Sequence, residues 1–438
     1  MANVLRRMPP RRPENTGRKM LERSLVTKAA TLTLLLGCAL PSATAAPVSN
    51  ISVEAASRTV PTTPSAVFQP SRYTPAGLRI SFTPLKTDRS RGFLDLVLIP
   101  MEGAIIGRRV DVETAQLAAL LRALYDQLGT QKPIDLNDSQ TPSRQLYSLL
   151  IAPLASDLQR LGISTLLIAT DPTLQAVPFA ALSDGKRFFG EAFAFSLTPS
   201  IRLTPLSPPE NRGPQRTLVA GASRFSTMAP LPLVPQEVER VSQGGHSERV
   251  LDGAFTSVRL LEAAADPEIR RVHVATHAEF QPGSPEKSWI QTGTGPMSFA
   301  DFSRLRQRRQ DSPLDLFSLS GCRTALGDQQ SELGFSGLAL QAGARSAVGT
   351  LWFVDDVATS AFFVQFYRYL DQGLPKAEAL QATRIAFASG LVRLEGNRVV
   401  GEGGELLSQL TPDQRARIRL GLRHPYFWSG VSLFGAPW

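Results

Sequence analysis

Apolar and polar residues follow two alternating patterns along the chain, and each pattern predicts one kind of element. Short apolar or β-branched runs predict buried strands at 78–84, 92–100, 165–170, 217–221, 271–278, 314–320, 346–352 and 427–434. Apolar residues that recur every three or four positions predict helices at 111–127, 143–162, 236–243, 257–265, 334–341, 357–370 and 376–389. Strands that alternate with helices favour an α/β fold, a three-layer sandwich around a mostly parallel sheet.

The 438 residues exceed the usual size of one domain, and length alone suggests two or three. Residues 46–78 are rich in Pro, Ser and Thr without periodicity, which predicts an extended linker, with ordered structure beginning near Leu78. A Pro-rich crossing at 203–215 separates two series of strands and helices. We therefore expect an N-terminal half at 79–205 and a C-terminal half at 206–438.

Residues 1–45 have the pattern of a secretory signal peptide. A basic segment ends at Lys28, an apolar run too short to span a bilayer follows, and Ala43-Thr44-Ala45 is a small-residue cleavage site. Cleavage is expected before Ala46, which predicts a secreted or periplasmic protein. The alternative is a lipid anchor at Cys38, because Leu-Leu-Gly-Cys at 35–38 resembles a bacterial lipobox.

Removal of this leader would lower both the net charge and the number of cysteines. Eight Lys and Arg residues and two acidic residues precede Ala46, so the leader carries +6 of the net +9 and the remainder +3. Nucleic acid is therefore not an expected partner, and the basic run Arg304–Arg309 is interpreted as a solvated face. After cleavage before Ala46, Cys322 is the one remaining cysteine and a lone thiol.

Two of the predicted strands end on side chains that suit nucleophilic catalysis. The first leads to His277 and the second to Cys322. Ligands of parallel α/β sheets bind at the carboxyl ends of strands, so the two side chains meet there if the strands are neighbours. His277 would then act as base toward a Cys322 thiolate, and the backbone N–H groups of Ala278 and Cys322 would hold an oxyanion.

Metal and cofactor chemistry find little support in the sequence. His273 and His277 would pair on a helix, but on a strand they lie roughly 13 Å apart, too far for one ion, so His273 is interpreted as a core residue. His-Glu-x-x-His and Cys-x-x-Cys motifs are absent, and the glycines at 401–404 do not follow a predicted strand. We expect no metal and no cofactor.

Several segments together resemble the CHAT domain family, in chain order over roughly 80–438. They are VPFAAL at 177–182, LPLVPQEV at 231–238, VATHAEF at 274–280, LSGCRTALG at 319–327, AGARSAVGTLWFVDD at 342–356 and HPYFW at 424–428. The resemblance implies a caspase- and separase-like fold with a degenerate N-terminal half, and it places the family's catalytic residues on His277 and Cys322. It also implies that a separate tetratricopeptide-repeat protein is a candidate partner.

The sequence departs from the family pattern in two places. Ala278 follows the histidine where the family often has glycine, although its N–H survives. Ser320 stands two residues before the cysteine, where basic-specific relatives carry an acidic residue, which weakens any claim of Arg or Lys specificity. The candidate substrate-binding residues are Ser320, Glu332, Trp352 and Asp355, and helix capping after Trp352 is assigned to Asp356.

The predicted function is a secreted or periplasmic cysteine peptidase that cleaves a protein or peptide substrate with the pair His277 and Cys322. A catalytically silent signalling or interaction module on the same fold is the alternative, and another acyl-transfer hydrolase is a third reading.

Overall fold

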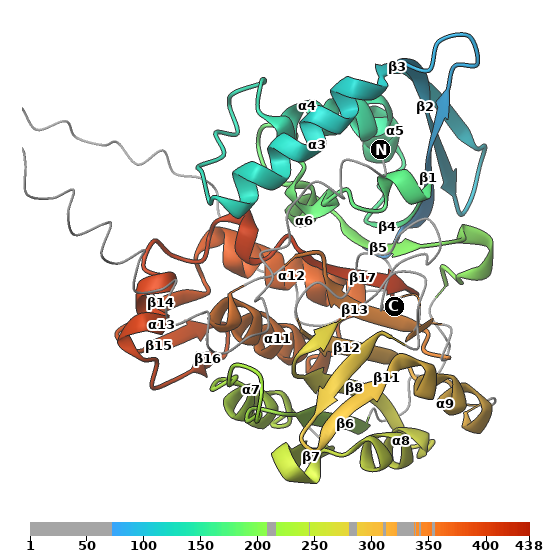
Figure 1. Cartoon of the computed structure of the whole chain (residues 1–438). Helices are drawn as coiled ribbons and strands as arrows, with labels where there is room; N and C mark the ends of the chain where they lie inside the picture. Colours follow the sequence, from blue (N-terminus) through green and yellow to red (C-terminus); the bar gives the residue numbers. More distant parts are fainter. Residues whose placement is uncertain are drawn as a thin grey trace, which may run out of the picture. The chain divides into compact units, whose positions relative to one another are not determined.

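Eleven strands form one sheet in the computed structural model of the chain (Figure 1). The structure describes residues 72–207, 216–244, 246–279, 287–309, 312–321, 337, 339–340, 343–352 and 355–438, all within one unit that contains Thr62–Trp438. The predicted signal peptide, the Cys38 anchor and most of the predicted linker lie outside the described residues. Cys322 and Glu332 also lie outside them.

The elements of the N-terminal half are β1 (Pro75–Pro84), β2 (Arg91–Pro100), β3 (Ile106–Glu113), α3 (Thr114–Gly129), α4 (Pro142–Leu150), α5 (Ala155–Arg160), β4 (Thr165–Thr170), α6 (Phe189–Ala192) and β5 (Ala194–Thr198). Those that follow are β6 (Arg216–Gly221), α7 (Val234–Val241), β7 (Ser247–Leu251), α8 (Ser257–Ala265), β8 (Ile269–Ala275), β9 (Ala278–Glu279), β10 (Trp289–Thr292), β11 (Gly295–Ser298), α9 (Ser303–Arg308), β12 (Leu316–Ser320), β13 (Ser346–Thr350), α11 (Asp356–Asp371), α12 (Lys376–Ser389), β14 (Arg393–Glu395), β15 (Arg398–Gly401), β16 (Gly404–Leu407), α13 (Pro412–Arg417) and β17 (Val431–Gly435).

The strand order is β3-β2-β1-β4-β5-β17-β13-β12-β8-β6-β7, and the strands form two parallel blocks of opposite direction. β1, β4, β5 and β17 run parallel to one another, as do β13, β12, β8, β6 and β7. The blocks meet where β17 pairs antiparallel with β13. Their carboxyl ends therefore lie at opposite edges of the sheet, where 'edge' means the side at which the strands end. Each such edge is a place where a parallel sheet can bind a ligand.

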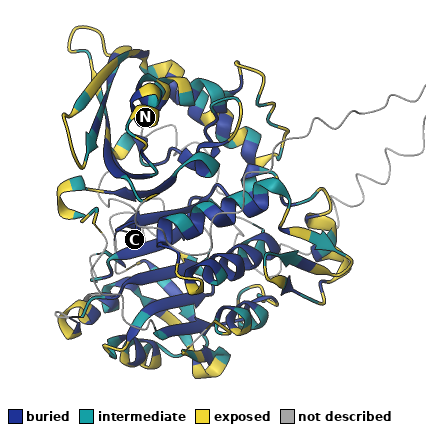
Figure 2. Ribbon diagram, turned by 180° about the vertical axis from the view of Figure 1, so that it is seen from behind, coloured by how far each residue is buried: buried dark blue, intermediate teal, exposed yellow. Residues whose placement is uncertain are grey.

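Alternate residues of the C-terminal strands pack into two separate apolar clusters, one on each face of the sheet. Leu316 and Val348 join the cluster that contains α7, α11 and α12, whereas Phe317 and Leu319 join the one that contains α8 and α9. This period of two is what strands buried on both faces require. The predicted α/β fold with a large, mostly parallel sheet and helices on both faces is confirmed, and its strands are largely buried (Figure 2).

Most predicted elements are confirmed, and the helices at 257–265 and 376–389 have the bounds expected. The single helix predicted at 143–162 is wrong, because the chain forms α4, a 3₁₀ turn at Ala152–Leu154 and α5. Pro153 lies at the break, and proline cannot donate the hydrogen bond that a continuous helix needs. The helix predicted from 111 begins only at Thr114, after the missed strand β3. The helix predicted at 334–341 lies mostly outside the described residues.

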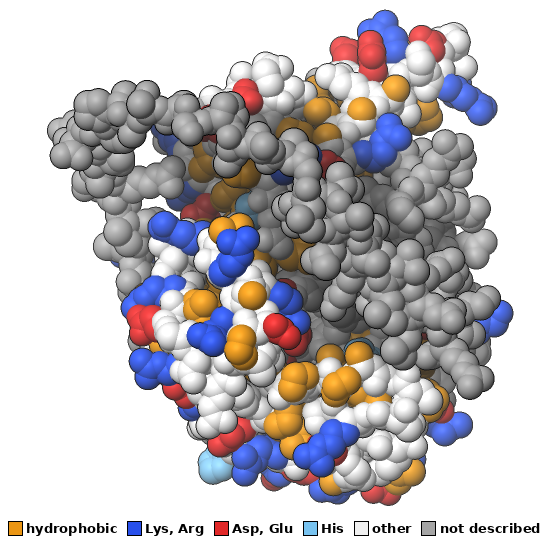
Figure 3. Space-filling view, turned by 60° about the vertical axis from the view of Figure 1, so that its left-hand side comes forward, with side chains coloured by type: hydrophobic (Ala, Val, Ile, Leu, Met, Phe, Trp, Pro, Cys, Tyr) orange, Lys and Arg blue, Asp and Glu red, His pale blue; other side chains and the backbone are white. Residues whose placement is uncertain are grey.

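On the face seen in Figure 3, Lys and Arg side chains are interspersed with Asp and Glu. Within the basic run, Arg304, Arg306 and Arg308 are exposed as predicted. The prediction is wrong for Arg309, which is buried and donates to Ala264 O at 2.8 Å. Across the described part of the chain, no helix is both long enough and apolar enough to cross a membrane.

Candidate functional site

The two strands that lead to His277 and Cys322 are neighbours and end at the same level. Ser320, the last residue of β12, pairs with Ala275, the last residue of β8. Gly321 then lies directly beside the chain that leaves β8, since a Cβ added to it would be 3.0 Å from Thr276 O and 3.6 Å from Ala278 Cβ. Cys322 follows Gly321 in sequence and lies outside the described residues.

The His277 ring is half-buried and is held from two sides by the loop that follows β6. Its Nε2 lies 2.8 Å from Ala229 O, and its ring centroid lies 4.9 Å from that of Phe225. A carbonyl oxygen only accepts hydrogen bonds, so Nε2 carries the proton in the neutral ring. Nδ1 is then the unprotonated nitrogen and the one able to take a proton.

The backbone of the residue after His277 is oriented by the antiparallel pairing of β9 with β10. Ala278 pairs with Ile290 across β9 and β10, and Gln291 N donates to His277 O at 2.8 Å. Hydrogen-bonded and non-hydrogen-bonded pairs alternate in an antiparallel ladder, so Ala278 and Ile290 form a non-hydrogen-bonded pair. The Ala278 N–H therefore points away from β10.

A third strand, β13, reaches the same edge and fixes the peptide group that follows β12. Thr350, its last residue, is buried, and its hydroxyl donates to Gly321 O at 2.7 Å. The adjacent parallel strands β8, β12 and β13 thus all end at this edge. Sequence reasoning did not single out Thr350, because its partner is 29 residues away and no local pattern marks it.

A cavity of about 60 Å³ adjoins His277 at this edge. Ser320, a predicted substrate-binding residue, lines it and is buried. Thr276, Gly321 and Thr350 line it at the ends of β8, β12 and β13. The other lining residues come from the loop after β6, from α7 and from the start of α11; they are Leu231, Leu233, Val234, Glu237, Asp356, Thr359 and Ser360.

Glu237 in this cavity belongs to a buried chain of polar side chains. The side chain of His273 is fully buried; its Nε2 lies 3.0 Å from Glu237 Oε1, and its Nδ1 lies 3.1 Å from Ser318 Oγ. Ser360 Oγ donates to Glu237 Oε2 at 2.7 Å. Tyr367 OH lies 2.5 Å from Ser318 Oγ, and burial raises the Tyr367 pKa, so the phenol stays protonated. His273 is therefore hydrogen-bonded within the core, in line with its interpretation.

Sequence reasoning missed Glu237, although a signal exists. Val234, Glu237, Val238 and Val241 share the buried face of α7 at the spacing of an amphipathic helix. A carboxylate within an apolar stripe is unusual, because burial of a charged group without partners is costly. The sequence pattern therefore could have predicted Glu237 as a buried, hydrogen-bonded carboxylate.

Two other predicted substrate-binding residues make structural contacts. Trp352 Nε1 donates to Tyr426 O at 3.1 Å, and the indole lies edge-to-face on Tyr125 with centroids 5.7 Å apart. Asp355 Oδ1 accepts from the N–H of Val357 at 2.9 Å, and its side chain caps α11. The assignment of the cap to Asp356 is wrong, because Asp356 is already the first residue of the helix.

Arg417 pairs with both acidic residues at this helix start. Its Nε lies 2.8 Å from Asp355 Oδ2, and its guanidinium also contacts Asp356. Burial raises the Asp355 pKa, against the opposing effect of Arg417. A role of Trp352, Asp355 or Ser320 in substrate binding stays a prediction. Within the described ranges, no group of three or more His, Cys, Asp or Glu residues is arranged to hold a metal ion.

These elements define an α/β protein whose candidate site lies at the carboxyl edge of a parallel block of strands. Within that class, the chain belongs to the CHAT domain family, whose model matches residues 140–436. The family match includes every strand from β4 onward, together with His277 and Cys322. It begins after β1–β3 and α3, which the resemblance had included.

Solved structures similar to this chain include a separase and a cysteine proteinase. The separase of the Saccharomyces cerevisiae separase–securin complex has 10% identity and a TM-score of 0.47, over 84% of this chain and 30% of that one. This chain thus spans less than a third of that separase chain. The arginine-specific cysteine proteinase gingipain R has 9% identity and a TM-score of 0.39, over 66% of this chain and 68% of that one. No curated protein matches the sequence.

Proposed function

We propose that the chain is a cysteine peptidase of the CHAT family that acts with His277 and Cys322 on a protein or peptide substrate. The observation that supports this most strongly is the His277 ring itself. Ala229 O fixes the proton on Nε2, so Nδ1 is the basic nitrogen, at the edge where β12 ends two residues before Cys322.

In the proposed reaction, His277 Nδ1 takes the Cys322 thiol proton, and the thiolate attacks the carbonyl carbon of the scissile peptide bond. The N–H groups of Ala278 and Cys322 stabilise the oxyanion. The His277 imidazolium returns its proton to the leaving amine as the C–N bond breaks. Water, deprotonated by His277, then hydrolyses the thioester and restores the thiol.

The location that we propose is outside the cytoplasm, secreted or periplasmic, after removal of residues 1–45. It rests on the signal-peptide pattern of the leader and has a direct test. The mass of the processed N-terminus distinguishes cleavage before Ala46 from a lipidated Cys38. A full-length chain retained in the cytoplasm contradicts the proposal.

The catalytic proposal is tested with a peptidyl acyloxymethyl ketone, in which a thiolate displaces the carboxylate and forms a stable thioether. Labelling of the reduced chain without residues 1–45 is expected, and it is lost in Cys322→Ser and in His277→Gln. His246→Ala is the matched control, because His246 is an exposed histidine before β7. Its labelling rate is expected to equal that of the wild type.

The alternative is a catalytically silent module that binds a partner protein through the same fold. It predicts a folded, reduced chain that shows no labelling, and that result contradicts the peptidase. Labelling that survives His277→Gln also contradicts the mechanism, because the thiol would then react without the proposed base.

A further inference from the structure

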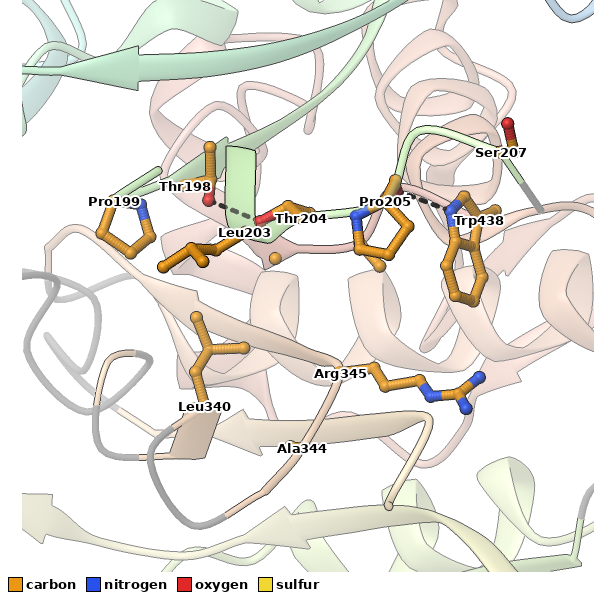
Figure 4. A pocket seen from close by; sticks show the side chains of 12 residues that line it. Thr198, Pro199, Leu203, Thr204, Pro205, Ser207, Leu340, Ala344, Arg345 and Trp438 are labelled. Carbon is orange, nitrogen blue, oxygen red and sulfur yellow. Dashed lines mark hydrogen bonds between the residues drawn. The ribbon is translucent and has the colours of Figure 1, made fainter. Parts of the chain in front are cut away.

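A larger pocket of about 500 Å³ lies at the other edge of the sheet from His277 (Figure 4). It forms at the carboxyl ends of β5 and β17 and at the amino end of β13, where the two blocks of strands meet. Twelve residues line it: Thr198, Pro199, Leu203, Thr204, Pro205, Ser207, Leu340, Ala344, Arg345, Gly435, Ala436 and Trp438. Its volume is typical of small-molecule sites.

The pocket has apolar walls on two sides. Figure 4 shows Leu203, Pro205 and Trp438 along one side and Leu340, Ala344 and Arg345 along the other. Leu203 is 84% exposed, whereas Trp438 is buried and only 6% exposed. The Trp438 Nε1–H donates to Pro205 O at 2.9 Å, so the polar atom of the indole is already used and a small part of its apolar ring surface faces the pocket.

Arg345 gives the pocket its charge. It is the one ionisable side chain among the twelve lining residues. Its guanidinium carbon lies 5.7 Å from the Trp438 ring, and no Asp or Glu of the described ranges lies within ion-pair distance of it. A single guanidinium beside apolar walls complements a ligand with one negative charge and an apolar body. A guanidinium also binds a carboxylate in a bidentate manner.

We propose that this pocket binds a small amphiphilic carboxylate, with its carboxylate on Arg345 and its apolar body along Leu203, Leu340 and Trp438. Two sources share this chemistry, a fatty acid and an acylated apolar amino acid such as the end of a peptide. The proposal does not depend on the activity of His277 and Cys322, because the pocket lies at the opposite edge of the sheet.

The test is isothermal titration of the chain without residues 1–45 with decanoate and with N-acetyl-leucine. Binding of at least one is expected, with 1-decanol binding much more weakly because it lacks the charge. Arg345→Gln is expected to weaken binding roughly tenfold or more. Arg304→Gln is the matched control, because Arg304 is an exposed arginine on α9.

Leu203→Glu provides a second variant that does not touch Arg345. Because Leu203 is exposed, this change is expected to leave the fold intact and to repel the carboxylate. A preference for decanoate or for N-acetyl-leucine identifies the source, and either supports the site. Affinity unchanged in Arg345→Gln, or no heat from either ligand with folded wild type, overturns the proposal.

Discussion

Replacement of Glu237 tests whether the buried polar chain beside the candidate site is fully hydrogen-bonded. Glu237 is 1% exposed and accepts from Ser360 and His273, both of which are buried as well. Glu237→Leu keeps approximately the same shape but leaves these two donors without an acceptor. Each buried unsatisfied group costs about 1–3 kcal/mol, so the expected loss is about 4 kcal/mol in the free energy of unfolding.

Glu237→Gln retains one acceptor oxygen, so it is expected to cost about 2 kcal/mol, half as much. Glu239→Gln is the matched control on the same helix, because Glu239 is exposed and its change is expected to stay within about 0.5 kcal/mol. Urea unfolding followed by circular dichroism measures these differences. With a slope of about 3 kcal/mol per molar urea, Glu237→Leu shifts the midpoint by roughly 1 M.

A double-mutant cycle identifies the interaction responsible. Glu237→Leu with His273→Leu removes both partners of the 3.0 Å contact, so no unpaired partner of that contact remains. The double change is expected to cost at least about 1 kcal/mol less than the sum of the two single changes. Two results refute the reasoning: a Glu237→Leu chain as stable as the Glu239→Gln control, or single costs that simply add.

Three further predictions concern other sites. Thr350→Val removes the hydrogen bond to Gly321 O and is expected to slow Cys322 labelling roughly tenfold, while the free energy of unfolding falls by only about 1 kcal/mol. Burial raises the Asp371 pKa to about 6, so the folded chain holds that proton more tightly than the unfolded chain, and the free energy of unfolding falls as the pH rises from 4 to 6. Asp371→Asn is expected to reduce this fall. Gly430→Ala is expected to cost about 1–3 kcal/mol, because its Cβ would lie 2.7 Å from an indole carbon of Trp352.

Each of the three predictions has a result or a control variant that would contradict its proposed cause. Labelling equal to wild type in Thr350→Val contradicts a role of its hydroxyl in positioning Gly321. For the pH dependence, Asp413→Asn changes an exposed carboxylate on α13, and an equal effect there removes the case for Asp371. Gly253→Ala places its Cβ in open space, so a cost equal to that of Gly430→Ala refutes the predicted clash.

The elements that the sequence predicts well are those whose burial is uniform along their length. β4 and β8 are buried over nearly every residue, and each contains a short, largely apolar run that identifies it, at 166–169 in β4 and at 272–275 in β8. β3 and β7 were missed because they are the two outermost strands of the sheet and carry charged residues. Their sequences are IGRRVDVE and SERVL. Edge strands of this kind lack the apolar signal, since part of their surface faces water.

Strand order is a different matter, because periodicity carries no information on which strands pair. β17, the last strand of the chain, lies between β5 and β13, so the two blocks join through a segment more than 200 residues from β5. The same limit applies to the site. Local patterns predicted β8 and β12 and the residues that follow them, but their pairing entered only as a condition and is shown by the structure. The contact of His277 with Ala229 spans 48 residues and has no local sign.

The position of β13 explains why one segment of the chain bears on two sites. The strand crosses the sheet from the pocket edge to the His277 edge, with Arg345 directly before its first residue and Thr350 at its end. The two proposals therefore make opposite predictions for two residues of one segment. Arg345→Gln is expected to weaken decanoate binding and leave Cys322 labelling unchanged, whereas Thr350→Val is expected to do the reverse. If either variant alters both measurements alike, the edges do not act as separate sites, and the assignment of distinct chemistry to each is wrong.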